Sequence, residues 1–398
     1  MKYDFDKVYD RRGTNSLKFD FAAERGVPTD VLPLWVADMD FPAPTCVTEA
    51  LHNKAAHGIF GYSEPKEDYF AALKHWFSSR HGWQTEGRKF VLTCGVVFSL
   101  CALIRALTEK GDAVLICQPV YYPFAASVRD NDRRPVISEL INQDGYYTVD
   151  FDDFERKIVE NDVKLFILCN PHNPVGRVWT REELARMGDI CLRHGVFVIS
   201  DEIHSDFVWA GHCHTVFSTV KKEFEAISAI CTAPTKTFNL AGLHIANTYI
   251  ASDDVRRKFL RELDRVGYSQ SNVMGIVACQ AAYQGGASWL DELKKYLAEN
   301  ISFVENYLHE HMPEISMRVP EGTYLLWLDF RKLGFPDREI RTKMLSEAKL
   351  WLDDGYIFGK GGSGFQRINV ACPRSVLVQA LGRIEKAFGG APRKGEKE

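Results

Sequence analysis

Short apolar runs alternate with longer amphipathic segments through the middle of the chain. Several of these runs are rich in Val, Ile and Leu, namely 89–93, 112–117, 134–140, 163–169, 196–200, 226–231 and 245–250. Strands that are apolar along their whole length are typical of a sheet with helices on both faces. The pattern therefore predicts an α/β fold built on a mostly parallel sheet.

One helix between these runs is clearly marked at both ends. Thr180 stands where a helix at 180–195 would begin, and Glu183 follows three residues later. This spacing is that of a capping box, in which the two residues satisfy each other's backbone N–H groups. Gly195 follows as the residue that closes the helix. We expect a helix here, between two strands of the sheet.

The pattern changes after about residue 290. Two helical stretches, 289–312 and 337–349, surround segments that alternate between apolar and polar residues. Such a pattern predicts a smaller α+β domain, on which the loop-rich N-terminal segment would pack. We therefore expect a large domain at 46–288, a small domain formed by 1–45 and 289–390, and a disordered charged tail at 391–398.

Composition excludes several classes of function. The 398 residues carry a formal net charge of −4, without the basic face that nucleic-acid binding requires. Apolar runs stay far below the ~20 residues that span a bilayer, and the charged N-terminus does not have the pattern of a secretory signal. Ten cysteines include no C-x-x-C pair, which favours reduced thiols and a cytoplasmic location. We expect neither nucleic-acid nor membrane partners.

Three short motifs follow apolar runs and carry reactive side chains. They are "NPVG" (173–176), "DEIH" (201–204) and "TKTF" (235–238). Ligands of open α/β sheets bind outside the carboxyl ends of the strands. Asp201 alone could be a metal ligand, a catalytic carboxylate, a partner for a ring nitrogen, or a helix cap. Lys236, set among small and hydroxyl residues, is typical of a reactive amine.

The order and spacing of Asn173, Asp201 and Lys236 resemble the fold type I enzymes of pyridoxal 5'-phosphate (PLP), the class I and II aminotransferases. The resemblance extends from 32–41 to 364–375, and it implies a seven-stranded sheet in the PLP-binding domain. It also implies roles: Lys236 binds the cofactor's aldehyde, Asp201 keeps the pyridine nitrogen protonated, and Asn173 binds the 3-hydroxyl oxygen.

The resemblance implies further contacts to the cofactor and the substrate. Those to the cofactor come from His204, Tyr121, Gly95, Val96, Val97, Thr232, Thr235 and, across a homodimer with shared active sites, Tyr62. Those to a small amino-acid substrate come from Arg367, Val36, Ala37, Asn173 and Tyr121. Tyr121 would stack on the ring, and Arg367 would bind the substrate carboxylate. One departure is His244, which stands where many relatives carry an arginine for the phosphate.

Longer phrases narrow the resemblance to one subgroup. "LWVADMDF", "SDEIHSDFVW" and "GFQRINVACPRS" are most similar to the MalY/PatB-type C–S lyases, also called cystathionine β-lyases. This implies α,β-elimination of L-cystathionine or cysteine-type thioethers to a thiol, pyruvate and ammonia. Two alternatives stay open: an aminotransferase for a bulky amino acid, and a PLP-binding regulator that acts through a transcription factor. We expect no metal, since "GHCHT" (211–215) is spaced too tightly for a zinc site.

Overall fold

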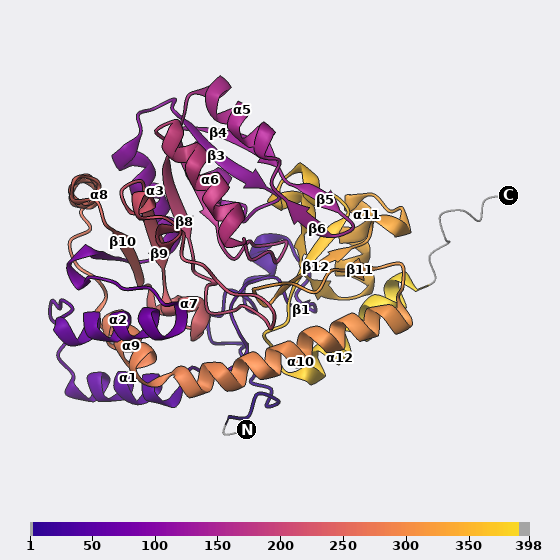
Figure 1. The fold of residues 1–398 in the computed structure, drawn as a ribbon. Helices are drawn as coiled ribbons and strands as arrows, with labels where there is room; N and C mark the ends of the chain where they lie inside the picture. Colours follow the sequence, from indigo (N-terminus) through magenta and orange to yellow (C-terminus); the bar gives the residue numbers. More distant parts are fainter. Residues whose placement is uncertain (1–2, 390–398) are drawn as a thin grey trace.

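The computed structural model describes residues 3–389, so the tail expected at 391–398 lies outside it. A seven-stranded sheet forms the centre of the larger part (Figure 1). Its strands, in spatial order, are β2 (Phe90–Thr93), β10 (Ala246–Ile250), β9 (Ser228–Thr232), β8 (Phe197–Asp201), β7 (Val163–Cys169), β3 (Ala113–Gln118) and β4 (Arg134–Glu139). β10 is antiparallel to both neighbours, and all other pairs are parallel. The predicted α/β fold is confirmed.

Both faces of this sheet are buried, as the apolar strands predict. In β3, Leu115 and Cys117 belong to one core, while Val114 and Ile116 belong to a second core on the opposite face. Helices on the two faces, and one short helix after β9, are α1 (Thr45–His57), α2 (Glu67–His81), α3 (Val96–Leu107), α4 (Pro123–Asp130), α5 (Phe151–Asn161), α6 (Arg181–Arg193), α7 (Pro234–Thr237), α8 (Asp253–Arg265) and α9 (Val273–Gly285).

The helix marked by the capping box is α6. Thr180 Oγ1 accepts a hydrogen bond from the Glu183 backbone N–H at 3.1 Å, and the Glu183 carboxylate accepts one from the Thr180 N–H at 2.8 Å. Arg177 donates to the same carboxylate at 2.9 Å, so the cap also anchors the loop before the helix. This prediction is confirmed within two residues at either end.

A second, four-stranded antiparallel sheet lies in the C-terminal part. Its order is β11 (Ser316–Met317), β12 (Leu325–Asp329), β15 (Phe365–Asn369) and β14 (Asp353–Asp354). The long α10 (Ala287–His311) and α12 (Arg374–Phe388) run beside each other along it (Figure 1). The helix expected at 337–349 is α11 (Asp337–Thr342), which continues as a π-helical turn, Lys343–Glu347.

The N-terminal segment is tied to this C-terminal part. β1 (Leu32–Pro33) pairs in parallel with β13 (Leu350–Trp351), and the rings of Trp35 and Trp351 stack with centroids 4.4 Å apart. The domain boundaries stay a prediction.

A small hairpin of β5 (Ile141–Gln143) and β6 (Tyr146–Thr148) completes the strands. Short 3-10 turns lie at Ala23–Arg25, Gly87–Lys89, Phe217–Thr219, Lys222–Glu225, Ala241–Leu243, Arg331–Leu333, Gly355–Phe358 and Lys360–Gly362. Within residues 3–389, no helix has the length and apolar character needed to cross a bilayer.

Candidate active site

A cavity of about 890 Å³ lies where the central sheet, the N-terminal segment and the C-terminal sheet meet. Most of the residues singled out from the sequence line it: Lys236, Asp201, Asn173, His204, Tyr121, Gly95, Val96, Val97, Thr235, Arg367, Val36 and Ala37. They come from positions up to 331 residues apart in the chain, between Val36 and Arg367. The fold therefore gathers these candidate residues at one place.

The strands deliver the acidic and amide side chains to this cavity. Asp201 is the last residue of β8, directly opposite Cys169 at the end of β7, and the loop after β7 carries Asn173. That loop turns at Gly176, whose φ of +73° favours glycine, and a Cβ there would lie only 2.6 Å from the Pro320 Cβ. The turn therefore requires the glycine of "NPVG".

Lys236 is a buried amine with an altered acidity. It lies in the short helix α7, just after β9, and its Nζ donates to the Ala37 carbonyl at 2.7 Å. Burial lowers the pKa of Lys236 to about 8, and the positive Arg367 acts in the same direction, while Asp38 and Asp201 oppose it. A large fraction of this amine is therefore neutral in mildly alkaline solution, as a nucleophile or proton acceptor requires.

Asp201 is buried as well, and its charged form lacks strong support from the protein. Burial raises the pKa of Asp201 to about 7, with Glu202 adding to the effect; the Ile203 N–H and Lys236 act against it. Among residues 3–389, the only hydrogen bond to the carboxylate comes from that N–H, at 3.1 Å. A cationic ring nitrogen beside Asp201 would favour the ionised carboxylate.

His204 is neutral at physiological pH. Burial lowers the pKa of His204 to about 3, and the positive charges of Lys236 and Arg367 act in the same direction. Its Nδ1 is buried and has no hydrogen-bond partner in the described part of the chain, residues 3–389. A polar ligand in the cavity would offer this nitrogen the partner that a buried polar atom requires.

Arg367 projects from β15 and is almost fully buried. Its guanidinium donates to Asn173 Oδ1 at 3.0 Å and to the Trp35 carbonyl at 2.8 Å, and it forms an ion pair with Asp353. Its Nε has no partner among the residues that the structure describes. Asn173 in turn accepts the Tyr121 backbone N–H at 3.0 Å through its carbonyl, so the proposed cofactor and substrate contacts form one connected unit.

The residues of this cavity fit PLP. Gly95, Val96 and Val97 line it where α3 begins, and the first N–H groups of a helix bind phosphate well because no helix carbonyl accepts from them. The unpartnered nitrogens of His204 and Arg367 supply polar contacts on the same cavity. Lys236 would bind the aldehyde, Asp201 the pyridine nitrogen, and Tyr121 would stack on the ring.

Two of the predicted residues do not line the cavity. Thr232 is buried, and its hydroxyl donates to the Asn247 carbonyl at 2.9 Å. This hydroxyl is therefore already hydrogen-bonded within the central sheet. Tyr62 is 94% exposed and lies beside a separate depression near 267–274. Within one chain, these two positions are therefore apart from the other candidate residues.

Sequence reasoning also missed several cavity residues. The N-terminal segment contributes Arg11, Asn15, Ser16, Leu17, Trp35 and Asp38, and the C-terminal sheet contributes Asp353. Asp38 lies within the phrase "LWVADMDF", which pointed only to Val36 and Ala37. Nothing in the local sequence distinguishes Asp353, because its place in the cavity depends on how two strands pair.

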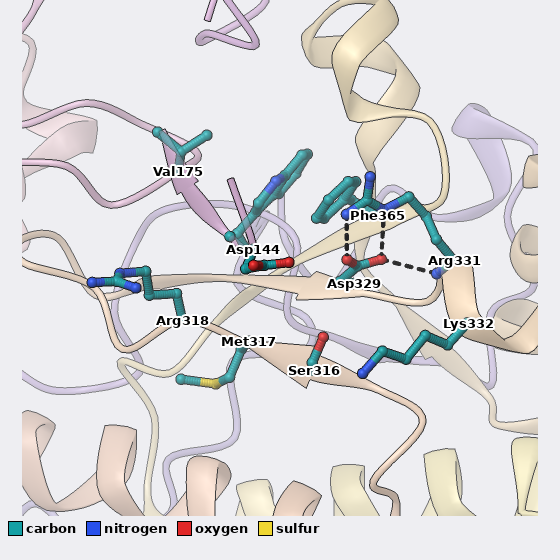
Figure 2. A pocket seen from close by; sticks show the side chains of 11 residues that line it. Asp144, Val175, Ser316, Met317, Arg318, Asp329, Arg331, Lys332 and Phe365 are labelled. Carbon is teal, nitrogen blue, oxygen red and sulfur yellow. Dashed lines mark hydrogen bonds and ion pairs between the residues drawn. The ribbon is translucent and has the colours of Figure 1, made fainter. Parts of the chain in front are cut away.

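A second cavity, of about 580 Å³, is lined by Trp327, Asp329, Arg331 and Phe365 among others and holds none of the predicted site residues. Figure 2 shows its charged side chains, in which Arg331 binds Asp329 through two nitrogens. The Arg331 guanidinium also covers the ring of Phe365 at 4.6 Å. Arg331 and Asp329 are therefore already paired with each other, unlike the unpartnered nitrogens of the first cavity.

The structure thus combines a seven-stranded α/β sheet with a cavity at the carboxyl ends of its strands, in which a lysine and an aspartate are buried. This is the arrangement of PLP enzymes of the aminotransferase type. The chain belongs to the aminotransferase class I and II family, which it matches over residues 29–384. It is 44% identical to cystathionine beta-lyase PatB of Bacillus subtilis (strain 168), over 96% of this chain and 99% of the relative.

Two further comparisons agree. The chain is 37% identical to protein MalY of Escherichia coli (strain K12), over 97% of this chain and 99% of the relative. It also matches the crystal structure of cystalysin from Treponema denticola, which contains PLP, with a TM-score of 0.94 and 37% identity over 98% of this chain and 99% of that chain.

Proposed function

We propose that the chain is a PLP-dependent carbon–sulfur lyase, which cleaves L-cystathionine or cysteine-type thioethers by α,β-elimination to a thiol, pyruvate and ammonia. The observation that carries the proposal is the buried Lys236 amine, whose pKa of about 8 leaves it ready to exchange protons, in one cavity with Asp201 and Arg367. Near-full-length identity to cystathionine beta-lyase PatB supports the same reaction for this chain.

Lys236 has two tasks in this reaction. When bound, PLP supplies two groups. Its aldehyde bonds to an amine, and its aromatic ring accepts the electron pair left on the substrate's Cα. Lys236 would hold PLP through the cofactor's aldehyde, and its Nζ, when free and neutral, would take the proton from the substrate's Cα. The lowered pKa suits both tasks, because only the neutral amine is a nucleophile or a base.

The cavity walls hold the reacting parts in place. Asp201 would keep a proton on the ring nitrogen, and Asn173 and His204 would bind polar atoms of the cofactor. Arg367 binds the α-carboxylate of the substrate, with Val36 and Ala37 beside it. A fixed carboxylate and a fixed amine leave the Cα–H bond in reach of Lys236, which is how positioning lowers the barrier.

A direct assay distinguishes a lyase from an aminotransferase. The purified protein, loaded with PLP, is incubated with L-cystathionine in the absence of any 2-oxo acid. We expect pyruvate, ammonia and homocysteine in equal amounts. If pyruvate is absent and amino-group transfer requires added 2-oxoglutarate, the lyase assignment is wrong and the aminotransferase reading replaces it.

We further propose that the protein is a homodimer with shared active sites. The loop before α2 exposes Ile59, Phe60 and Tyr62, at 67%, 56% and 94% of their surfaces, and exposed apolar side chains in one patch are typical of an interface. Tyr62 of the partner subunit would donate its hydroxyl to the cofactor's phosphate. This hydrogen bond would partly offset the lack of an arginine at the position of His244, which also lines the cavity.

Mixing two impaired variants tests this arrangement. Lys236→Ala and Tyr62→Ala are each expected to have little activity, but one site of the mixed dimer would contain both native residues. Refolding the two together should therefore restore activity above either parent. An unchanged activity after mixing, or sedimentation of the active enzyme as a monomer, contradicts the shared site.

We also propose a cytoplasmic location, consistent with ten cysteines that form no disulfide in the structure.

A further inference from the structure

The side chain of Arg367 is already bound to a carboxylate before any substrate arrives. Asp353 forms an ion pair with its guanidinium, and the two side chains are only 7% and 3% exposed. The pairing follows from the sheet: Asp353 of β14 lies directly opposite Arg367 of β15 in the antiparallel register. Both residues also line the proposed active-site cavity. Opposite side chains of neighbouring strands project on the same face, so this contact is part of the fold.

A substrate carboxylate would have to share this guanidinium with Asp353. Arg367 already donates three of its five N–H groups, to Asn173, Trp35 and Asp353, which leaves the Nε–H and one N–H of Nη1 for the newcomer. Two carboxylates on one buried guanidinium give the site a net negative charge. Burying an uncompensated charge is costly, and carboxylates in such a pair avoid the cost when one of them takes up a proton.

Other charged groups near Asp353 do not remove this cost. Its neighbour Asp354 is acidic, and it already binds Arg341 and Gln366. Tyr121 and Tyr122, across the cavity, are neutral phenols whose pKa values are raised by burial. Arg25 stacks on Trp35, one layer further out. The cation that faces Asp353 is therefore Arg367, the same group that the substrate carboxylate needs.

We propose that Asp353 is part of the carboxylate site, and that it binds one proton from solvent whenever the carboxylate of a substrate binds Arg367. The proton neutralises Asp353, releases the guanidinium for the ligand, and lets the carboxyl group of Asp353 donate a hydrogen bond in the site. No bond other than that O–H forms. The inference rests on the proposed function, because it takes Arg367 as the group that binds the substrate carboxylate.

The local environment supports this coupling. Burial raises the pKa of Asp353 to about 6, with Asp354 acting in the same direction and Arg367 against it. Near pH 7 the free residue is mostly ionised but close to its titration range. A second carboxylate on Arg367 weakens the one interaction that favours the charge, so the pKa of Asp353 rises further and a proton is bound.

Calorimetry with a non-reacting ligand tests the proposal. The probe is 3-(methylthio)propanoate, which has a carboxylate and a thioether but no amine to react with PLP. Its binding to the PLP-loaded protein at pH 7 is measured in two buffers of different ionisation enthalpy, which reveals the protons taken up. We expect close to one proton per ligand, and an affinity that falls about tenfold or more between pH 5.5 and 7.5.

Three variants complete the design. Asp353→Asn should bind the probe without proton uptake and with little pH dependence. Asp329→Asn, a matched control in the cavity of Figure 2, should keep the uptake, since neither Asp329 nor its partner Arg331 lines the cavity that holds Arg367 and Asp353. Arg367→Lys should lose most of the affinity, because a point charge cannot replace a guanidinium that donates in several directions.

The outcomes separate the two claims. If Arg367→Lys binds the probe as the wild type does, Arg367 is not the carboxylate site and that part of the proposed function fails. If its affinity is lost but the wild type takes up no proton at pH 7, the coupling to Asp353 alone is wrong. Uptake that persists in Asp353→Asn also overturns the coupling. The wild-type measurement remains decisive even if that variant does not fold.

Discussion

Burial of the Lys236 amine should make the free energy of unfolding of the PLP-free protein depend on pH. The pKa of this lysine is about 8 in the folded chain and 10.5 as its ordinary value. Between these pH values the unfolded chain holds a proton that the folded chain has lost. The free energy of unfolding therefore rises with pH in this window, and the destabilisation by the buried charge is fully present below pH 8.

The size of the effect follows from the shift. Each pKa unit corresponds to about 1.4 kcal/mol, so Lys236 costs the folded state about 3 kcal/mol at pH 7, before its hydrogen bond to Ala37 is counted. Lys236→Met removes this titration while filling a similar volume. The difference in unfolding free energy, wild type minus variant, should grow by about 2 kcal/mol between pH 7 and 9.5.

Urea unfolding of both PLP-free proteins across that pH range measures this difference directly. Other groups titrate in both proteins, so their contributions cancel when the variant is subtracted. A difference that stays constant from pH 7 to 9.5 would show that Lys236 has its ordinary pKa in the folded chain. The argument for a neutral, reactive amine would then lose its physical basis.

Three further substitutions test other parts of the account. Asp201→Ala should abolish turnover while leaving the melting temperature close to that of the wild type; a near-normal turnover number would reduce Asp201 to a structural role. Thr180→Ala should destabilise the protein by about 1 kcal/mol in urea, because the N–H of Glu183 loses its acceptor, and no loss would mean the cap is unimportant. Gly176→Ala should cost more than about 1 kcal/mol, since the left-handed turn and the contact with Pro320 both oppose a Cβ; unchanged stability would contradict the close packing of that loop.

Features set by neighbouring residues were predictable from the sequence. The strand at 163–169 was expected with the bounds that the structure gives, because a run of apolar residues is itself the signal. The cap formed by Thr180 and Glu183 also depends only on spacing along the chain. The order of the three motifs carried the resemblance to a known family, and it was this resemblance that placed Asn173, Asp201 and Lys236 in one site; the three line one cavity.

Features set by pairing between distant segments were not predictable from the sequence. Asp353 lies in the active-site cavity because β14 takes one particular register beside β15, and no local pattern encodes that register. The hydroxyl of Thr232 binds a carbonyl of the neighbouring strand β10 instead of facing the cavity. Arg11 reaches the cavity because its ion pairs with Asp38 and Asp40 hold the N-terminal segment there, an interaction visible only in three dimensions.

The central claim is that Lys236 is the amine that binds PLP. Reduction of the PLP-loaded protein with borohydride converts the link between cofactor and lysine into a stable bond, and a tryptic digest then shows which lysine carries it. We expect a single modified peptide that contains Lys236 in the wild-type protein, and no modification at that position in Lys236→Ala. A cofactor adduct on any other lysine of the wild-type protein would contradict it.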